Sequence, residues 1–554
     1  MDIAKIPQLV RNTGRLQEVV AVLLRYGLAP WLTELPGEWI QRKLQTGGGE
    51  TIGEMTQPQR IRHALAELGT TYIKLGQILS TRADLVGPEL AAELSQLQSS
   101  TTPDAADIVV KTIETELGRS TDVVFRDFET TAMASASIGQ VHRATLPNGT
   151  RVVVKVQHDG IEDRINNDLE ILIELARAAE AYAPQLTQYR PLATAQEFRK
   201  TLLAELDFTR EQRNLARFAR NFADDDGVRF PTPFPEFCSP RVLTMELMEG
   251  ITVANKDQLA QSGFDLTDLA QRGANMFVQM VFRDGFYHAD PHPGNLLVLP
   301  NAVIGVLDAG MVGRIDEELR DQIEDLLLGA VGQDTRLLLD AVVQLGEMPP
   351  DFDRTELKND LLTFVDEYGA QSMDRFDLSG ALDEMTAIIR RHHIILPARV
   401  SMLIKMLVML EGTTQKLSPQ FSLAELLLPY RAEAIKRRLS PVRFWRRLQS
   451  THRDWSRLVE SFPGDTLDIL HRLRRGSMDI HLQHRRLDSI VNRLVMGILT
   501  AALFVGSASL WSSNVEPLLW GVSVPGALGC SLAMVLGINL IRAIHSSGDM
   551  RDSG

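Results

Sequence analysis

The sequence predicts an α+β protein in which a helical extension, a small strand-rich lobe, a larger helical lobe and two apolar helices follow one another. Three observations support this order. Short β-type runs are concentrated between residues 123 and 157, helical periodicity dominates from residue 266 onward, and two uncharged segments lie near the C-terminus. A chain of 554 residues is too long for one hydrophobic core and is expected to form several domains.

Composition and charge exclude some classes of protein. Hydrophobic residues make up 44% and charged residues 23% of the chain, which is typical of a folded protein rather than a disordered one. The net charge of −13 argues against nucleic acid as a partner. The two cysteines, Cys238 and Cys530, cannot build a disulfide framework or a cysteine zinc site, and they fit a reducing cytosolic compartment.

The first 120 residues are predicted to be helical. Residues 1–55 contain an apolar stretch, Val19 to Leu32, that includes Arg25 and Pro30 and lacks a small-residue cleavage pattern. We therefore expect an amphipathic helix there, docked on the domain or lying at a membrane surface, rather than a signal peptide. Residues 56–120 form the helical extension, because apolar residues recur at helical spacing from Thr56 to Ser99.

Residues 121–250 are predicted to form the strand-rich lobe with a helical insert. The runs VVFRDF, IGQVHRATL and RVVVKVQ are strand-like, and Pro147-Asn148-Gly149 between the last two is a hairpin turn. Helical patterns at 161–181 and 192–222 form the insert, and 242–247 is a further strand. Residues 251–430 form the helical lobe, which is interrupted by a predicted strand pair at 296–299 and 303–307.

Lys155 is the first candidate functional residue. It ends the apolar run Val152-Val153-Val154 on a strand that follows a hairpin. A lysine in that place is able to hold the α- and β-phosphates of ATP, as in the V-A-I-K motif of kinases. Its carboxylate partner is left open by the residues alone, because Glu170 and Glu174 are as suitable as Glu205.

The segment His288-Ala289-Asp290-Pro291-His292-Pro293-Gly294-Asn295 is the second candidate. The spacing of Asp290 and Asn295 matches a kinase catalytic loop, in which the aspartate accepts or orients the attacking proton and the asparagine binds metal. Two histidines four residues apart also suggest zinc, but that motif requires an unbroken helix, which the prolines forbid.

Asp308 is the third candidate. It ends an apolar strand in the pattern Asp-x-Gly, 13 residues after Asn295, which is the position of a metal-binding aspartate in kinases. One aspartate and one asparagine, together with a nucleotide, provide the hard oxygen ligands that Mg²⁺ prefers. Three motifs in this order predict a two-lobed protein-kinase-like fold that binds ATP and Mg²⁺.

A glycine-rich phosphate loop is missing from the expected position. An alanine-rich loop takes its place, with the residues Ala134, Ser135, Ala136, Ser137, Ile138, Gly139 and Gln140. This loop is stiffer than a glycine-rich one and offers fewer backbone amides for close approach to phosphate. We expect it to bind the nucleotide nonetheless, together with Glu246 and Met248 at the end of the strand 242–247.

With these motifs in hand, the chain resembles the UbiB/ADCK (AarF) family of atypical kinase-like proteins of ubiquinone biosynthesis, from about Thr56 to Arg314. The resemblance is carried by Lys74-Leu75-Gly76-Gln77 (K-x-G-Q), ASASIGQVH, Glu205-Leu206-Asp207 (E-x-D) and HADPHPGN. It implies that Lys155 pairs with Glu205, that Asp290 is the catalytic aspartate, and that Asn295 and Asp308 bind magnesium. It further implies that Lys74 and Gln77 lie over the site, where a protein substrate would otherwise dock. One departure is Ala309, where the D-F-G motif has phenylalanine, and this puts the packing that positions Asp308 in doubt.

The C-terminal region is predicted to anchor the chain. Residues 431–493 carry 15 lysines and arginines against 7 acidic residues, which suggests juxtamembrane helices facing lipid. Within 494–541, residues 494–511 and 518–541 are free of charge and predict two transmembrane helices, with both ends and the tail 542–554 in the cytoplasm. A buried hairpin in a soluble bundle is the alternative, because the first segment is short and Pro525 interrupts the second.

These features predict a membrane-anchored ATPase or atypical kinase of the bacterial inner membrane type that supports isoprenoid quinone biosynthesis. Expected partners are a membrane lipid or quinone intermediate and other quinone-biosynthesis proteins. Two alternatives remain: a small-molecule or lipid kinase, and a nucleotide-gated, lipid-binding scaffold with negligible catalysis. Phosphate release, a phosphorylated product, or nucleotide binding without turnover would distinguish the three.

Overall fold

The computed structural model describes residues 13–28, 55–97, 101–183, 190–349, 352–369, 371, 376–426, 487–513, 515–519 and 522–545. These residues fall into two compact units, one within 1–443 and one within 444–554. Each unit is described by itself below. The predicted basic segment 431–493 lies outside the described residues except for 487–493, and of the predicted segment 1–55 only 13–28 and 55 are described.

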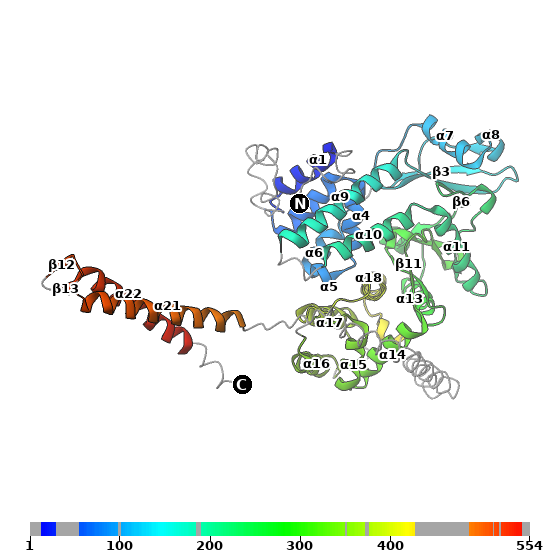
Figure 1. Cartoon of the computed structure of the whole chain (residues 1–554). Coiled ribbons are helices and arrows are strands. Elements are labelled where there is room, and N and C mark those ends of the chain that lie inside the picture. The colour runs from blue at the N-terminus through cyan, green and yellow to red at the C-terminus, as the bar shows by residue number, and fades with distance from the viewer. Residues whose placement is uncertain are drawn as a thin grey trace, which may run out of the picture. The chain divides into compact units, whose positions relative to one another are not determined.

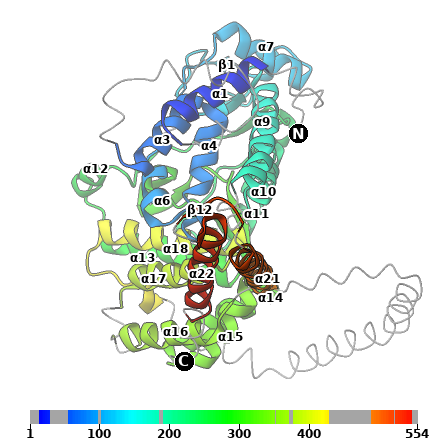
Figure 2. The same cartoon turned by 60° about the vertical axis from the view of Figure 1, so that its left-hand side comes forward.

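The helices of the extension are α1 (Thr13–Arg25), α3 (Gln57–Leu68), α4 (Thr70–Leu79), α5 (Ala83–Val86), α6 (Pro88–Leu94), α7 (Ala106–Leu117) and α8 (Thr121–Val124). The helices α1 and α3 to α6 pack together as one layer, whereas α7 and α8 pack against the sheet of the small lobe. The helix α4 lies between α3 and the insert helix α9 (Ile161–Tyr182) (Figure 2). The amphipathic helix α1 docks on this layer through Val19 and Val22, and Arg15 forms an ion pair of 2.8 Å with the buried Asp168 of α9. Of the two expectations for this helix, docking on the domain is the one the structure shows.

The small lobe is built on an antiparallel sheet of order β1-β3-β4-β6, with β2 added to β3. The strands are β1 (Asp127–Phe128), β2 (Ala134–Ser135), β3 (Gly139–Thr145), β4 (Arg151–Gln157) and β6 (Val242–Glu246). Because side chains alternate along β4, Val152, Val154 and Val156 face a core with α7, whereas Val153 belongs to the main core on the other face. Lys155 shares that second face, between Val141 and Leu243 in register.

Two expectations for this lobe are corrected. The run VVFRDF is not one strand, because Val123 and Val124 belong to α8 and only Asp127–Phe128 pair with β3. The predicted helix at 192–222 is two helices, α10 (Pro191–Glu205) and α11 (Phe208–Asn221). The break falls at Asp207, whose side chain caps α11 by accepting a hydrogen bond from Thr209 N at 3.1 Å.

The larger lobe is mainly helical (Figure 1). Its helices are α12 (Lys256–Gln261), α13 (Leu266–Phe282), α14 (Glu317–Val331), α15 (Thr335–Leu345), α16 (Arg354–Tyr368), α17 (Leu378–Arg391) and α18 (Ala398–Leu417). Its strands are β5 (Val228–Arg229), β7 (Ile251–Thr252), β8 (Phe286–His288), β9 (Leu296–Leu299), β10 (Val303–Val306) and β11 (Val312–Arg314). The predicted pair β9–β10 is present, and it joins a four-stranded sheet of order β5-β10-β9-β7.

The second unit contains α21 (Leu487–Ser512), the short strands β12 (Leu518–Leu519) and β13 (Val522–Ser523), and α22 (Val524–His545). The two helices pack closely, since a Cβ at Gly526 would lie 2.7 Å from the Trp511 nitrogen. By length and composition, Val495–Ser512 is the one stretch of the described residues that could cross a membrane. A second full-length span stays a prediction: Leu518–Leu519 and Val522–Ser523 are strands, and the apolar part of α22, Val524–Asn539, is shorter than the first candidate span.

Candidate active site

Lys155 and Asp308 come together between the two lobes. The Lys155 Nζ is 2.8 Å from Glu211 Oε2 and 3.8 Å from Asp308 Oδ2, and it lies 5.0 Å from the centre of the Phe208 ring. Both Glu211 and Phe208 are on α11, so this helix supplies the surroundings of the lysine. Burial opposes the charge of Lys155, but Glu211 and Asp308 outweigh it, and the pKa of the amine is raised above its ordinary value.

The expected pair of Lys155 with Glu205 is therefore wrong. Glu205 is the last residue of α10, and its Oε2 lies 2.6 Å from Lys74 Nζ of α4 instead. Burial likewise opposes the charge of Lys74, yet Glu205 raises its pKa. The chain thus has two parallel lysine–glutamate pairs, Lys74–Glu205 and Lys155–Glu211, held by successive helices. Glu174 of α9 bonds Arg177 at 2.8 Å and is not the lysine's partner.

Glu211 was missed by sequence reasoning although a signal for it is present. The buried residues of α11 are Phe208, Glu211, Leu215 and Phe218, which recur at helical spacing. A glutamate within an otherwise apolar stripe requires a buried cation, because an unpaired buried carboxylate is strongly unfavourable. That requirement, rather than the nearby E-x-D pattern, points to the partner of Lys155.

The catalytic-loop residues Asp290 and Asn295 are directly joined. The Asn295 side-chain amide donates to Asp290 Oδ2 at 3.3 Å, which leaves the amide oxygen of Asn295 available to a metal ion. His288, the first histidine of the motif, connects two loops: its Nδ1 accepts from Asp290 N at 3.1 Å, and its Nε2 donates to the carbonyl oxygen of Asp308 at 2.5 Å. These bonds require the neutral ring to carry its proton on Nε2.

Asp308 presents a carboxylate suited to a divalent cation. Its side chain is 44% exposed, and Oδ1 accepts a hydrogen bond from Gly310 N at 2.6 Å. Burial works against its ionisation, but the Lys155 ammonium and the Gly310 amide lower its pKa. With Asn295, it offers the hard oxygen donors that fit Mg²⁺. No cluster of three or more histidine, cysteine or acidic residues that could hold a metal occurs within the described ranges.

Ala309 is fully buried, so a small side chain fills the position at which the D-F-G motif has phenylalanine. Its carbonyl oxygen accepts a hydrogen bond of 2.9 Å from the Asn214 side chain of α11. The helix that holds Lys155 through Glu211 therefore also holds the segment next to Asp308. A single element, α11, fixes the relative positions of Lys155 and the segment that carries Asp308.

Hydrogen bonds from neighbouring segments hold the alanine-rich loop in place. Ala134 and Ala136 are exposed and Ser135 is half-buried, whereas Ser137, Ile138, Gly139 and Gln140 are buried. Thr101 Oγ1 donates to the Ala136 carbonyl at 2.6 Å, and His158 bonds the same carbonyl and Asp104. Gly139 must lack a side chain, since a Cβ there would lie 2.5 Å from the Val156 carbonyl oxygen. These contacts fix the loop over the edge of the sheet.

The remaining expected residues do not join the lysine cluster. Gln77 donates to the carbonyl oxygen of Leu97 at 3.1 Å, so its amide holds the segment that leads to Thr101. Glu246 pairs with Arg229 of β5, a strand of the sheet in the larger lobe. Met248 is buried against Leu297 and Leu299. Contacts of these three residues with a nucleotide stay predictions.

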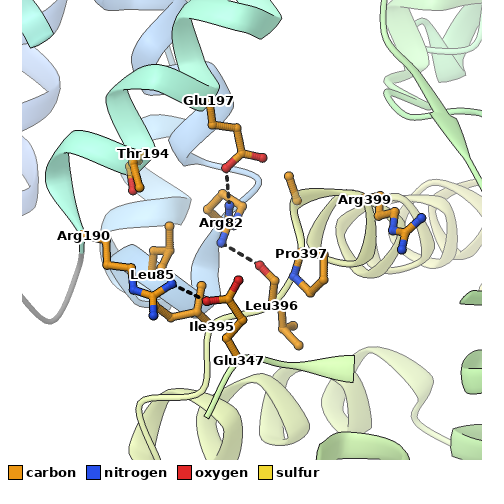
Figure 3. Close-up of a pocket in the computed structure, with 12 residues that line it drawn as sticks. Arg82, Leu85, Arg190, Thr194, Glu197, Glu347, Ile395, Leu396, Pro397 and Arg399 are labelled. Atoms are coloured by element: carbon orange, nitrogen blue, oxygen red, sulfur yellow. Dashed lines mark hydrogen bonds and ion pairs between the residues drawn. The ribbon is translucent and has the colours of Figure 1, made fainter. Parts of the chain in front are cut away.

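A cavity of about 430 Å³ lies where the extension meets the larger lobe (Figure 3). The buried Arg82 points into it from the turn after α4 and donates to the Leu396 carbonyl at 3.0 Å, while Glu197 lies 3.5 Å away (Figure 3). Arg190 bonds Glu347 across the same space. Each of these guanidinium groups has a carboxylate partner, so the cavity is a junction bridged by ion pairs rather than a nucleotide site.

The chain is similar to one family along most of its length. Residues 96–342 match the ABC1 atypical kinase-like domain, residues 361–422 the UbiB helical domain, and residues 479–546 the ABC1/UbiB kinase-like C-terminal domain. The chain is 31% identical to an "Uncharacterized protein in hydrogenase 1 5'region" of Clostridium pasteurianum, over 97% of this chain and 99% of that protein.

Two proteins described as "Probable protein kinase UbiB" are also similar. The one from Aeromonas salmonicida is 30% identical and the one from Aeromonas hydrophila 31%, each over 94% of this chain and 97% of the relative. A solved structure, of Rv3197 with erythromycin from Mycobacterium tuberculosis, aligns with a TM-score of 0.40 and 22% identity over 64% of this chain and 90% of that one.

Proposed function

Because the chain belongs to the UbiB family of ABC1 atypical kinase-like proteins, we propose that it binds ATP between its two lobes and hydrolyses it in support of isoprenoid quinone biosynthesis. One observation carries this proposal. Lys155, Glu211 and Asp308 form one charged cluster, and His288 ties that cluster to the Asp290–Asn295 loop. This brings all the groups of a phosphoryl-transfer site together.

Each residue has a role that follows from its contacts. Lys155, kept protonated by Glu211, binds phosphate oxygens of ATP. Asp290 orients the attacking water and accepts its proton, while the Asn295 amide holds the carboxylate in place. Asn295 and Asp308 would hold Mg²⁺, which supplies charge neutralisation on the phosphate oxygens when bound. His288 keeps Asp290 and Asp308 at a fixed separation.

The position of the helical extension favours ATP hydrolysis over the phosphorylation of proteins. Lys74 of α4 pairs with Glu205, six residues before the Glu211 that holds Lys155, so α4 reaches the site from the side of the extension. A folded protein substrate would have to displace α4 and break the Lys74–Glu205 pair. Water and small acceptors need no such displacement, so this arrangement favours hydrolysis or transfer to a small acceptor over the phosphorylation of a folded protein.

A small-molecule or lipid kinase is the second candidate, and a separate cavity favours it. This cavity, of about 400 Å³, lies beside the catalytic loop and is lined by His292, Pro293, Thr413, Lys256 and Lys416, among others. Its charged side chains are basic, so it suits an anionic acceptor.

The membrane part of the proposal depends on α21, which has the length and composition to anchor the protein near a lipid or quinone substrate.

The test is phosphate release by purified full-length protein in lipid. Asp290→Asn and Lys155→Ala should each remove most ATP turnover, because positioning and charge stabilisation provide nearly all phosphoryl-transfer catalysis. The matched control is Asp340→Asn on α15, where Asp340 only pairs with Arg354 at the surface. Wild-type turnover in a folded Asp290→Asn protein would refute the site. A phosphorylated lipid would favour the second candidate, and binding without turnover would favour the scaffold.

A further inference from the structure

Lys405 is a lysine that the site described above does not use. It lies on α18 in the larger lobe, and its Nζ donates a hydrogen bond to Ser80 Oγ at 2.9 Å. Ser80 follows α4 directly and donates in turn to the carbonyl oxygen of Gln77 at 2.6 Å. The ammonium group of a large-lobe helix therefore reaches the end of the helix that carries Lys74.

The surroundings of Lys405 contain little to neutralise its charge. In the part of the chain that the structure describes, no carboxylate lies within ion-pair distance of its Nζ, and Ser80 engages one of its three donors. Burial lowers the pKa of Lys405, and the charge that opposes this lowering is that of Asp290 in the catalytic loop.

Two contacts place α18 along the catalytic loop. Near the start of α18, the Arg399 carbonyl accepts a hydrogen bond of 2.8 Å from the Tyr287 hydroxyl, and nearer its end Thr413 lines a cavity with His292. Lys405 lies on α18 between these contacts and keeps free donors.

The other cations of the site are already engaged. Lys155 is held by Glu211, and Lys74 is held by Glu205. Between Asp290 and Asn295 the catalytic loop contains one basic residue, His292, whose Nδ1 accepts a hydrogen bond from Gly294 N and shapes the turn. A cation that contacts the oxygens of a transferring phosphoryl group stabilises the charge that they carry in the transition state. Lys405 is an amine with free donors on the helix that runs between the end of α4 and the catalytic loop.

We propose that Lys405 is a catalytic residue that contacts the γ-phosphoryl group of ATP through its ammonium, exchanging Ser80 for a phosphate oxygen. The inference rests on the proposed ATP hydrolysis. In that reaction the oxygen of water bonds to the γ-phosphorus, the bond from the β,γ-bridging oxygen breaks, and ADP leaves with the electron pair. The proton of the water passes to Asp290. Lys405 transfers no proton and stabilises the charge on the γ-oxygens.

A structural role is the competing explanation, in which Lys405 only ties α18 to α4 through Ser80. The two explanations differ in which ligands they affect. A γ-phosphate contact matters for a triphosphate and is absent with ADP, whereas a tie between helices affects both nucleotides alike. Ser80→Ala removes the tie and keeps the ammonium, so it is the matched control.

The experiment measures Kd for Mg-ADP and for the non-hydrolysable triphosphate Mg-AMP-PNP, and kcat and KM for ATP, on the full chain in lipid. Lys405→Met should weaken AMP-PNP binding by about tenfold or more, as expected for a hydrogen bond to a charged group, and leave ADP affinity within about twofold. It should also lower kcat more than it raises KM. Lys405→Arg should restore part of both, and Ser80→Ala should keep the wild-type ratio of the two affinities.

Equal losses for ADP and AMP-PNP, or a Ser80→Ala protein that behaves like Lys405→Met, would overturn the inference. If Lys405→Met does not fold, Lys405→Gln is measured instead, since it keeps a polar end without the charge. The proposed function fails in a different way: wild-type protein that binds both nucleotides but releases no phosphate refutes hydrolysis. In that case the ratio of the triphosphate and diphosphate affinities still decides whether Lys405 contacts the γ-phosphate.

Discussion

Replacing Glu211 by glutamine should separate the two lysine–glutamate pairs. Glutamine keeps the shape of the side chain but removes the charge 2.8 Å from Lys155 Nζ. The side chains of Lys155 and Glu211 are 20% and 6% exposed, so the lysine would stay largely withdrawn from water without its main partner. Removing one partner of a buried ion pair typically costs about 3–5 kcal/mol, and Asp308 at 3.8 Å offsets part of this.

Two measurable effects follow. Lys155 should move toward Asp308 and compete with Mg²⁺, so the Mg²⁺ concentration needed for half-maximal ATP turnover should rise. The pH dependence should change as well. The raised pKa of Lys155 means that its stabilisation is present below the ordinary lysine pKa and is lost as pH rises through the higher folded-state pKa. In Glu211→Gln the folded-state pKa of Lys155 falls, so the stabilisation from its charge should be lost at a lower pH.

The assay is urea unfolding and Mg²⁺ titration of turnover, with Glu205→Gln as the matched control. Glu205→Gln leaves Lys155 paired, so it should keep the Mg²⁺ requirement of the wild type and loosen only α4. If Glu205→Gln raises the Mg²⁺ requirement and Glu211→Gln does not, the assignment of partners is wrong.

Three further predictions concern the loop, the buried alanine and the anchor. Thr101→Val should weaken nucleotide binding severalfold, because it removes a hydrogen bond of 2.6 Å to the Ala136 carbonyl that is worth about 1 kcal/mol. Calorimetry would measure this change, and an unchanged Kd would mean that nucleotide binding does not depend on this hydrogen bond to the loop. Ala309→Phe should lower the free energy of unfolding by about 1–3 kcal/mol, since the site is fully buried; a wild-type urea midpoint would contradict that packing. Truncation after Arg486 should release the protein from membranes in high salt, as followed by fractionation, and retention there would show that α21 and α22 are not the main anchor.

The order of elements and the local motifs could be predicted from the sequence, because each depends on residues close together in the chain. Lys155 on its strand, the β9–β10 pair and the Asp290–Asn295 contact are of this kind. The partner of Lys155 could not be predicted from spacing. Glu205 and Glu211 are six residues apart, and the choice between them depends on the helix break at Asp207, which turns one glutamate toward Lys74 and the other toward Lys155.

Interactions between distant segments also could not be predicted, because spacing along the chain does not show which segments meet in the fold. Lys405 bonds Ser80 across 325 positions, and Thr101 clamps a loop 35 residues away. Freedom from charge does not ensure that a segment is helical: within the second apolar segment Leu518–Leu519 pairs with Val522–Ser523 as short strands, and α22 begins at Val524, with Pro525 in its first turn. Proline is well tolerated there, so it marks the start of the helix rather than an interruption.

The break between α10 and α11 has a consequence for how relatives of this protein can diverge. Glu205 ends one helix and Glu211 lies in the next, so the carboxylate that holds Lys74 of the extension and the carboxylate that holds Lys155 belong to separate helices. Substitutions along α10 can therefore change how tightly the extension is held, while α11 keeps Lys155 and the Asp308 segment in place. The residues that control entry to the site and the residues around Lys155 can therefore change independently. Two relatives with the same residues around this lysine can admit acceptors of very different size.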